Sequence, residues 1–191
     1  AVNLAVGLAR AGHRVALIDT DPQGSLGRWF MTRLDRGQTP ELEFSTASAW
    51  GIPYECRKLS KDHDIVLIDT PPKADSDLRP ALRAADLVLV PLAVSHVDLW
   101  ATEGVLDLSR REKRATRIVM NRARPGTRLA GAVAGEAATL DCEVLEPALG
   151  NRVVYAQTLG EGLGAQEAPK GPAHDEVAGL VAEVVKALPT G

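Results

Sequence analysis

Cysteine is scarce in this chain of 191 residues: Cys56 and Cys142 are the two it has, and they are far apart in the sequence. Neither belongs to a Cys-x-x-Cys pair or to a Cys/His cluster, which argues against a disulfide framework, a zinc site and an iron–sulfur cluster. No apolar run approaches the roughly 20 residues of a membrane span, and the first residues lack the basic segment of a signal peptide. We therefore expect a cytoplasmic protein.

Aromatic residues are also few, at 4% of the chain, so the core must be aliphatic. The core must instead be built from alanine, valine and leucine, which suit helices packed on a parallel sheet better than they suit an aromatic-rich β-sandwich. The net charge of -3 is small, so the bulk charge gives no sign of a nucleic-acid or acidic-membrane partner.

The hydrophobic pattern predicts strands that alternate with helices. Each strand is continuously apolar, which is typical of a parallel sheet covered on both faces. We therefore predict one α/β domain over residues 1–191, with a mostly parallel sheet and helices on both of its faces. The Gly/Pro-rich residues 160–172 form the one long irregular segment. Strands are expected at residues 14–18, 64–68, 87–92 and 117–121, with shorter candidates at 42–45 and 142–145, and helices at 1–10, 25–36, 54–62, 97–113, 128–140 and 175–188.

Polar side chains follow three of these strands. Asp19 and Asp21 follow the first, Asp69 follows residues 64–68, and Asn121 ends the strand at 117–121. Ligands of open parallel sheets bind at the carboxyl ends of the strands, and carboxylates without histidine or cysteine favour a hard cation such as magnesium. A lone aspartate after a strand is more often a turn or cap residue. The Asp-Pro-Gln-Gly tetrapeptide at 21–24, directly behind an apolar strand, is much more specific.

Taken together, these motifs resemble the ParA/MinD family of deviant Walker ATPases, and most of all its small ParA (ParF-like) partition proteins. Residues 15–25 (VALIDTDPQGS) are similar to the family's Walker A′ motif, and residues 64–72 (DIVLIDTPP) to its Walker B strand. Residues 87–92, 120–122 and 152–155 resemble later segments, so the resemblance covers nearly the whole chain. It implies a P-loop NTPase-like fold with ATP and Mg²⁺ as cofactors.

The resemblance also implies roles for individual residues. Asp21 would orient the attacking water, and Asp19 and Asp69 would hold the magnesium through its waters. Asn121, with Arg122 beside it, would contact the adenine base. Phosphoryl transfer depends on positioning and charge neutralisation more than on covalent chemistry, which agrees with such a set of residues.

A P-loop is missing from the sequence. No G-x-x-x-x-G-K-[ST] motif is present, and the glycine cluster at 160–164 lacks the lysine and lies between helices. In the family the P-loop immediately precedes the helix that here begins at Ala1. We therefore expect a chain truncated at its N-terminus, without the first strand and the P-loop. The complete protein would be an ATPase, whereas we expect the 191 residues alone neither to bind ATP tightly nor to hydrolyse it.

Positive charge is concentrated between residues 110 and 128, where eight arginines and lysines face a single acid, Glu112. Such a block is either a solvated helix face or a patch that contacts phosphates. ParA-type proteins bind DNA without sequence preference as ATP-bound dimers, and the resemblance places Asp98 near the dimer interface. The candidate DNA-binding residues are Arg110, Arg111, Lys113, Arg114 and Arg117.

The last predicted helix distinguishes ParA from MinD. MinD-type proteins end in a basic amphipathic membrane anchor, whereas residues 175–188 combine an apolar face with acids, so we expect no membrane binding. The sequence thus predicts a partition ATPase, nucleoid-associated, that forms a homodimer on ATP binding and is triggered by a ParB-like centromere-binding partner to segregate plasmid or chromosome DNA. A non-catalytic DNA-binding or dimerisation module, or another ATPase of the superfamily, remains the alternative.

Overall fold

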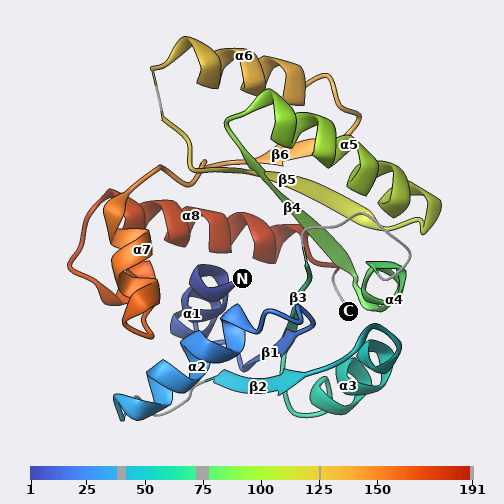
Figure 1. The fold of residues 1–191 in the computed structure, drawn as a ribbon, viewed down its shortest axis with the longest axis vertical. Helices are drawn as coiled ribbons and strands as arrows, with labels where there is room; N and C mark the ends of the chain where they lie inside the picture. Colours follow the sequence, from blue (N-terminus) through green and yellow to red (C-terminus); the bar gives the residue numbers. More distant parts are fainter. Residues whose placement is uncertain (38–41, 72–77, 125, 190–191) are drawn as a thin grey trace.

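The computed structural model describes residues 1–37, 42–71, 78–124 and 126–189. Helices and strands alternate along the chain (Figure 1). The strands are β1 (Val15–Asp19), β2 (Leu42–Thr46), β3 (Ile65–Asp69), β4 (Leu87–Ala93), β5 (Ala115–Asn121) and β6 (Glu143–Leu145). The helices are α1 (Val2–Arg10), α2 (Ser25–Asp35), α3 (Ile52–Leu59), α4 (Arg79–Ala84), α5 (His96–Arg111), α6 (Arg128–Ala137), α7 (Val153–Gly160) and α8 (Pro172–Ala187), with 3₁₀ turns at Ala49–Gly51 and Ala165–Glu167.

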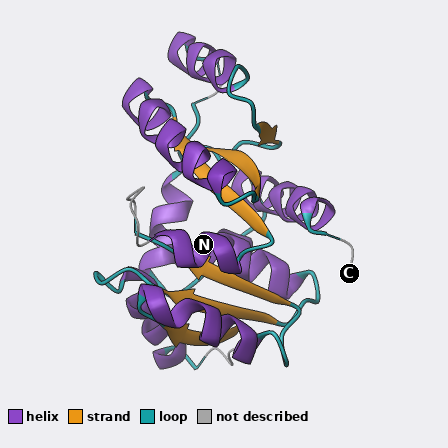
Figure 2. Ribbon diagram, turned by 90° about the vertical axis from the view of Figure 1, so that its right-hand side faces the viewer, coloured by secondary structure: helices purple, strands orange, loops and turns teal. Residues whose placement is uncertain are grey.

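The strands form two parallel sheets of three strands each. Their orders are β2-β1-β3 and β4-β5-β6, and every described pairing is parallel. Figure 2 shows the two groups of strands one above the other, with helices around both. The α/β class, the parallel pairing and the covering helices are as the sequence predicts. The division into two sheets is new: β3 pairs only with β1, and β4 only with β5, among the described strands.

The core follows from the alternation of side chains along each strand. In β1, Val15 and Leu17 pack with α1, α2 and α8, whereas Ala16 and Ile18 pack on the opposite face with Leu59 of α3. All five residues of β1 are buried, which accounts for the continuous apolar run. This strand is therefore the rigid centre from which the residues after it are positioned.

Helix α8 lies between the two sheets (Figure 1). Its buried residues Val177, Leu180 and Val181 belong to the same cluster as β1 and as Val119 of β5, so one core reaches both sheets. The prediction of a core-packing last helix is confirmed by this burial. Among the described residues, no helix combines the length and the apolar content that crossing a membrane requires.

Two helices were absent from the sequence prediction. Helix α4 has six residues, too few to show a helical period, and carries a proline in its first turn. Helix α7 begins with the β-branched and aromatic residues 153–155, which disfavour a helix by propensity. It is held by tertiary contacts instead: the Tyr155 hydroxyl donates to Glu176 Oε2 of α8 at 2.8 Å.

Candidate functional site

The carboxyl ends of β1 and β3 lie side by side. Asp19 pairs in register with Asp69, and adjacent strands are about 4.8 Å apart. Thr20 fastens the two ends together, because both its amide, at 3.0 Å, and its hydroxyl, at 2.7 Å, donate to the carbonyl of Asp69. The two aspartates that sequence reasoning singled out therefore occupy one edge of one sheet.

The carboxylate of Asp19 is almost fully buried, with 4% exposure, and organises the loop that follows β1. Its Oδ1 accepts from the amide of Asp21 at 3.0 Å, and its Oδ2 accepts from the amide of Gly27, in the first turn of α2, at 3.1 Å. Asp19 thus caps α2 from a distance and folds the loop over the strand end. Sequence reasoning assigned it only a role toward magnesium, and the backbone contacts add a structural one.

Asp21 stands in a tight turn between β1 and α2. Its Oδ1 accepts from the amide of Gln23 at 2.9 Å, and its carbonyl accepts from the amide of Gly24 at 2.9 Å. Gly24 adopts a φ of 64°, a left-handed conformation that suits glycine. The Asp-Pro-Gln-Gly sequence therefore makes the turn that holds Asp21 at the edge, with its Oδ2 free of protein donors among the described residues.

The charge of this edge is unbalanced. None of Asp19, Asp21 and Asp69 forms an ion pair with a side chain that the structure describes. Burial raises the pKa of Asp69 above its ordinary value, the neighbouring charges of Asp19 and Asp21 add to the rise, and the amino group of Ala1 opposes it. A cation at this edge would relieve the repulsion between the carboxylates.

The carboxylates at this edge suit magnesium better than a metal ion that needs three or more protein ligands. Within the described ranges, no group of three histidine, cysteine, aspartate or glutamate side chains is close enough to bind one ion. Magnesium is commonly held by one or two carboxylates together with waters and phosphate oxygens. Asp69 and Asp19 are suited to that kind of binding, because they are adjacent oxygen donors that form no ion pair with a described side chain.

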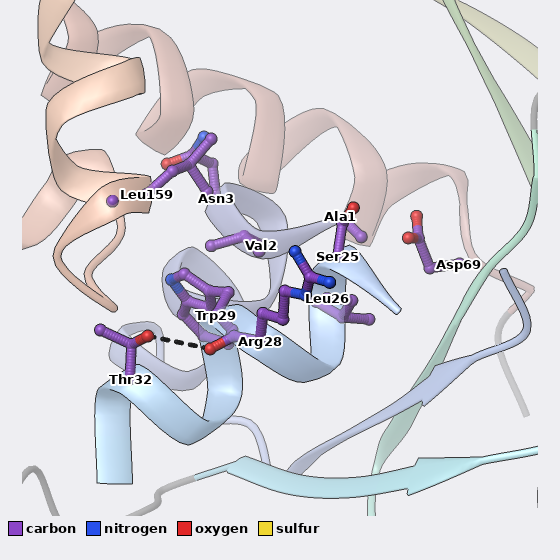
Figure 3. Close-up of a pocket in the computed structure, with 11 residues that line it drawn as sticks. Ala1, Val2, Asn3, Ser25, Leu26, Arg28, Trp29, Thr32, Asp69 and Leu159 are labelled. Carbon is purple, nitrogen blue, oxygen red and sulfur yellow. Dashed lines mark hydrogen bonds between the residues drawn. The ribbon is translucent and has the colours of Figure 1, made fainter. Parts of the chain in front are cut away.

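A cavity of about 530 Å³ opens beside Asp69 (Figure 3). Small-molecule sites fall in this range of volumes. Its walls come from the starts of α1 and α2, the end of β3 and the end of α7. The lining residues are Ala1, Val2, Asn3, Ser25, Leu26, Arg28, Trp29, Thr32, Asp69, Leu159 and Gly160. Sequence reasoning looked only at strand ends and therefore missed the contribution of α2 to this cavity.

Asn121 is the last residue of β5, in the other sheet, and Arg122 follows it; neither lines the cavity. Asn121 Oδ1 accepts from the amide of Arg122 at 3.0 Å, and Arg122 has a left-handed φ of 51°. The chain beyond β5 continues to pair with the segment before α7, where the amide of Ala123 donates to the carbonyl of Leu149 at 2.9 Å. A base contacted by Asn121 would thus also lie near residues 149–151.

The basic block divides between the two ends of β5, about 20 Å apart for seven residues. Arg122, Arg124 and Arg128 lie beyond the carboxyl end. The five candidate DNA-binding residues lie at the end of α5, in the turn before β5 and within β5. Three of these five are engaged: Arg110 pairs with Asp107 at 3.0 Å, Arg117 pairs with Glu143 at 2.7 Å, and Arg114 donates to the carbonyl of Ala85 at 3.3 Å. For Arg111 and Lys113 no ion pair is formed with a described residue.

Asp98 lies in the first turn of α5, and its amide donates to the hydroxyl of the N-cap residue Ser95 at 3.4 Å. Its neighbours Val97 and Trp100 are 67% and 65% exposed. Large apolar side chains that are this exposed often mark contact surfaces. Pro72, the second proline of the motif after β3, lies outside the described residues.

Comparisons with known proteins agree with the motifs. A family model described as "AAA domain" matches residues 36–122. The chain is 28% identical to the maintenance of carboxysome distribution protein A of Halothiobacillus neapolitanus, over 96% of this chain and 88% of that protein. It is 34% identical to the chromosome-partitioning ATPase Soj of Thermus thermophilus, over 56% of this chain and 53% of Soj.

The fold also matches a solved structure, the septum site-determining protein MinD of Pyrococcus horikoshii complexed with Mg-ADP. The TM-score is 0.76 at 17% identity, with 97% of this chain and 88% of that chain covered. The chain therefore has the same α/β fold, with parallel strands flanked by helices, as this solved MinD structure. In sequence and in fold, the chain is thus similar to these ParA/MinD-type ATPases.

Proposed function

We propose that the complete protein is a partition-type ATPase whose ATP- and Mg²⁺-dependent dimer moves a cargo inside the cell. The observation that carries the proposal is the register pairing of Asp19 with Asp69, with Asp21 held in the turn directly above. Carboxylates gathered at the end of parallel strands suit a magnesium nucleotide. The kinship with Soj and with the carboxysome distribution protein supports partitioning as the task.

Each carboxylate has a distinct part in this proposal. Asp21, whose Oδ2 is free, orients the attacking water at the terminal phosphate. Asp69 and Asp19 hold the waters of the magnesium, and the bound ion supplies charge neutralisation for the phosphates. The Thr20 bridge to the Asp69 carbonyl keeps the two strand ends at a fixed separation, so that these groups are positioned before the nucleotide arrives.

Substitution of Asp21 tests the role in hydrolysis. In the complete gene product, Asp21→Asn is expected to lower the rate of Mg²⁺-dependent ATP hydrolysis by about 100-fold or more, with ATP affinity unchanged within about threefold. The matched control is Asp86→Asn, an exposed aspartate before β4, which should leave turnover unchanged. Turnover of the Asp21→Asn protein at the unsubstituted rate would contradict the proposal.

We also propose that the ATP-bound homodimer binds DNA without sequence preference, associates with the nucleoid and is released by a ParB-like partner. Asp98 lies on the proposed dimer surface, next to the exposed Val97 and Trp100. Of the five candidate DNA contacts, Arg111 and Lys113 are the two whose side chains form neither an ion pair nor a hydrogen bond with a described residue. They are therefore the best pair for phosphate contacts.

DNA binding is tested by its dependence on salt. The double variant Arg111→Ala/Lys113→Ala should bind duplex DNA of any sequence more weakly and show a salt dependence reduced by about two counterions. The control is Arg124→Ala/Arg128→Ala, which removes the same charge at the opposite end of β5. Equal losses in both double variants would refute the assignment, since the two clusters are far apart.

A second candidate cargo comes from a relative that matches 96% of this chain, the carboxysome distribution protein of Halothiobacillus neapolitanus. A protein compartment rather than a replicon would then be distributed. Fluorescent labelling of the protein, of its own replicon and of any protein compartment in the same cell separates the two possibilities. The cargo is the one whose even spacing is lost when Asp21→Asn replaces the natural residue.

A further inference from the structure

Helix α2 carries an exposed arginine, Arg28, in the wall of the cavity beside Asp69. Arg28 lies in the first turn of the helix, where the backbone dipole favours acids and disfavours cations. The first turn holds no acidic residue of its own, and the helix start is capped from outside by Asp19, whose Oδ2 accepts from the amide of Gly27. A positive charge in this position costs the helix stability. Local rules are most often broken in this way at functional sites.

The other arginines of the same segment differ from Arg28. Arg33 is 4% exposed and forms an ion pair with Glu167 at 2.8 Å, and Arg36 pairs with Glu161 at 3.3 Å. Both fasten α2 to the segment after α7. The guanidinium of Arg28 makes no hydrogen bond or ion pair with any residue in the described part of the chain. Its charge is thus available to a ligand.

Arg28 also faces the acidic edge. It lines the 530 Å³ cavity together with Asp69, and it is the one arginine or lysine among the described lining residues. In Figure 3 its side chain runs along the cavity, with the guanidinium beside Ser25 and Leu26 and on the side of Ala1 and Asp69. The adjacent amide of Gly27 is bonded to Asp19, so the backbone that carries Arg28 is fixed relative to the carboxylates.

We propose that Arg28 binds the terminal phosphate of the nucleotide and neutralises part of its charge. This rests on the proposed function of the site as a magnesium nucleotide site. A carboxylate edge repels a triphosphate, and a cation on the facing wall offsets part of that repulsion in addition to the metal. The planar guanidinium can donate two parallel hydrogen bonds to phosphate oxygens. Arg28 therefore distinguishes a triphosphate from a diphosphate, which lacks the group it contacts.

The test compares two nucleotides in the complete gene product. Dissociation constants are measured by titration calorimetry for ADP and for a non-hydrolysable ATP analogue, both with Mg²⁺. Arg28→Ala should weaken binding of the ATP analogue by about 10- to 100-fold and change ADP affinity by less than about threefold. Arg28→Lys, which keeps the charge without the fork, should show an intermediate loss.

The control is Arg36→Ala, which removes an arginine near the other end of α2 and should leave both affinities unchanged. Thermal unfolding shows whether each variant is folded, and Arg28→Ala is expected to be at least as stable as the natural protein because the charge near the helix start is gone. Equal weakening of ADP and ATP analogue, or no weakening of either, overturns the assignment of Arg28. Failure of the unsubstituted protein to bind either nucleotide overturns the proposed function itself.

Discussion

The two ends of β3 carry aspartates in opposite circumstances. Asp64, just before the strand, receives the backbone amide of Arg14 at 2.8 Å and its guanidinium at 2.6 Å. This pairing lowers the pKa of Asp64 to about 2. Asp69, the last residue of the strand, has two further carboxylates for neighbours and a raised pKa. Asp64 thus stabilises the fold through its pair with Arg14. The ionised form of Asp69 is disfavoured in the fold, and a bound cation would stabilise it.

This contrast separates structural from functional acids without reference to any relative. A carboxylate that holds the fold together is hydrogen-bonded to a cation, and its ionised form is favoured by folding. A carboxylate prepared for a ligand is placed where its ionised form is disfavoured, and the fold bears that cost. Substitutions at the two ends of β3 should therefore differ in their effects on catalysis and on stability.

The largest difference concerns catalysis. In the complete gene product, Asp69→Asn should reduce Mg²⁺-dependent ATP turnover by about 100-fold or more, because an amide cannot supply the negative charge that holds the metal. Asp64→Asn, the same change at the other end of the strand, should alter turnover by less than about twofold. A steady-state phosphate-release assay across magnesium concentrations measures both. Similar losses in the two variants would remove the distinction.

A smaller effect on turnover is expected at the bridge between the strand ends. Thr20→Val keeps the shape of the side chain and removes the hydroxyl that donates to the Asp69 carbonyl. We expect turnover to fall by about three- to tenfold and the free energy of unfolding to fall by about 1 kcal/mol. The companion variant Thr20→Ser retains the hydroxyl and should recover most of the turnover. Phosphate release and urea unfolding are the measurements.

Removing the charge of Asp69 should stabilise the fold, whereas removing the charge of an aspartate in an ion pair destabilises it. Because its pKa is raised in the fold, ionisation of Asp69 costs stability as the pH rises from the ordinary value of 3.8 through the raised value. Asp69→Asn should therefore raise Tm at pH 7 by about 2 to 4 °C, the shift that about 1 kcal/mol produces in a chain of this size. The gain should shrink as the pH is lowered toward 3.8, where Asp69 of the natural protein takes up its proton.

The smallest expected change in Tm is that of the Asp64 substitution. Its lowered pKa means that its contribution is present above the ordinary value of 3.8 and is lost as the pH falls toward about 2. Asp64→Asn should lower Tm at pH 7, by less than about 2 °C because the pair with Arg14 is exposed to solvent. The difference from the natural protein should vanish near pH 2. A change of Tm with the same sign in Asp64→Asn and Asp69→Asn would break the comparison.

Much of the fold could be predicted from the sequence because the buried strands are read directly from their apolar runs. The expected strand at 64–68 is β3, Ile65–Asp69, and the expected helix at 25–36 is α2, Ser25–Asp35. Strand pairing could not be predicted in the same way, because the alternation of strands and helices along a chain does not say which strands lie side by side. Which strands pair could therefore not be read from the sequence, although the expected absence of the first strand implies that its neighbours in the sheet lack a partner.

The site shows the same limit. Asp19 and Asp69 could be placed at one sheet edge because each ends an apolar run, and such a run is recognised from neighbouring residues alone. The second role of Asp19, as acceptor for the amide of Gly27, depends on the path of the loop after β1 and carries no sequence signature. The presence of Arg28 in the cavity wall had a signal that could have been used, namely a cation in the first turn of a helix that lacks acids there.

The separate sheets have a practical consequence for handling the molecule. Along β3 and along β4, one side of each backbone has no described strand beside it, so the amides and carbonyls on that side have no strand partner among the described residues. Such rows of free peptide groups serve as templates on which other polypeptides assemble, and they do so faster as the concentration rises. Solutions of these 191 residues by themselves should accordingly cloud or form soluble clusters at concentrations where well-closed α/β proteins stay dispersed.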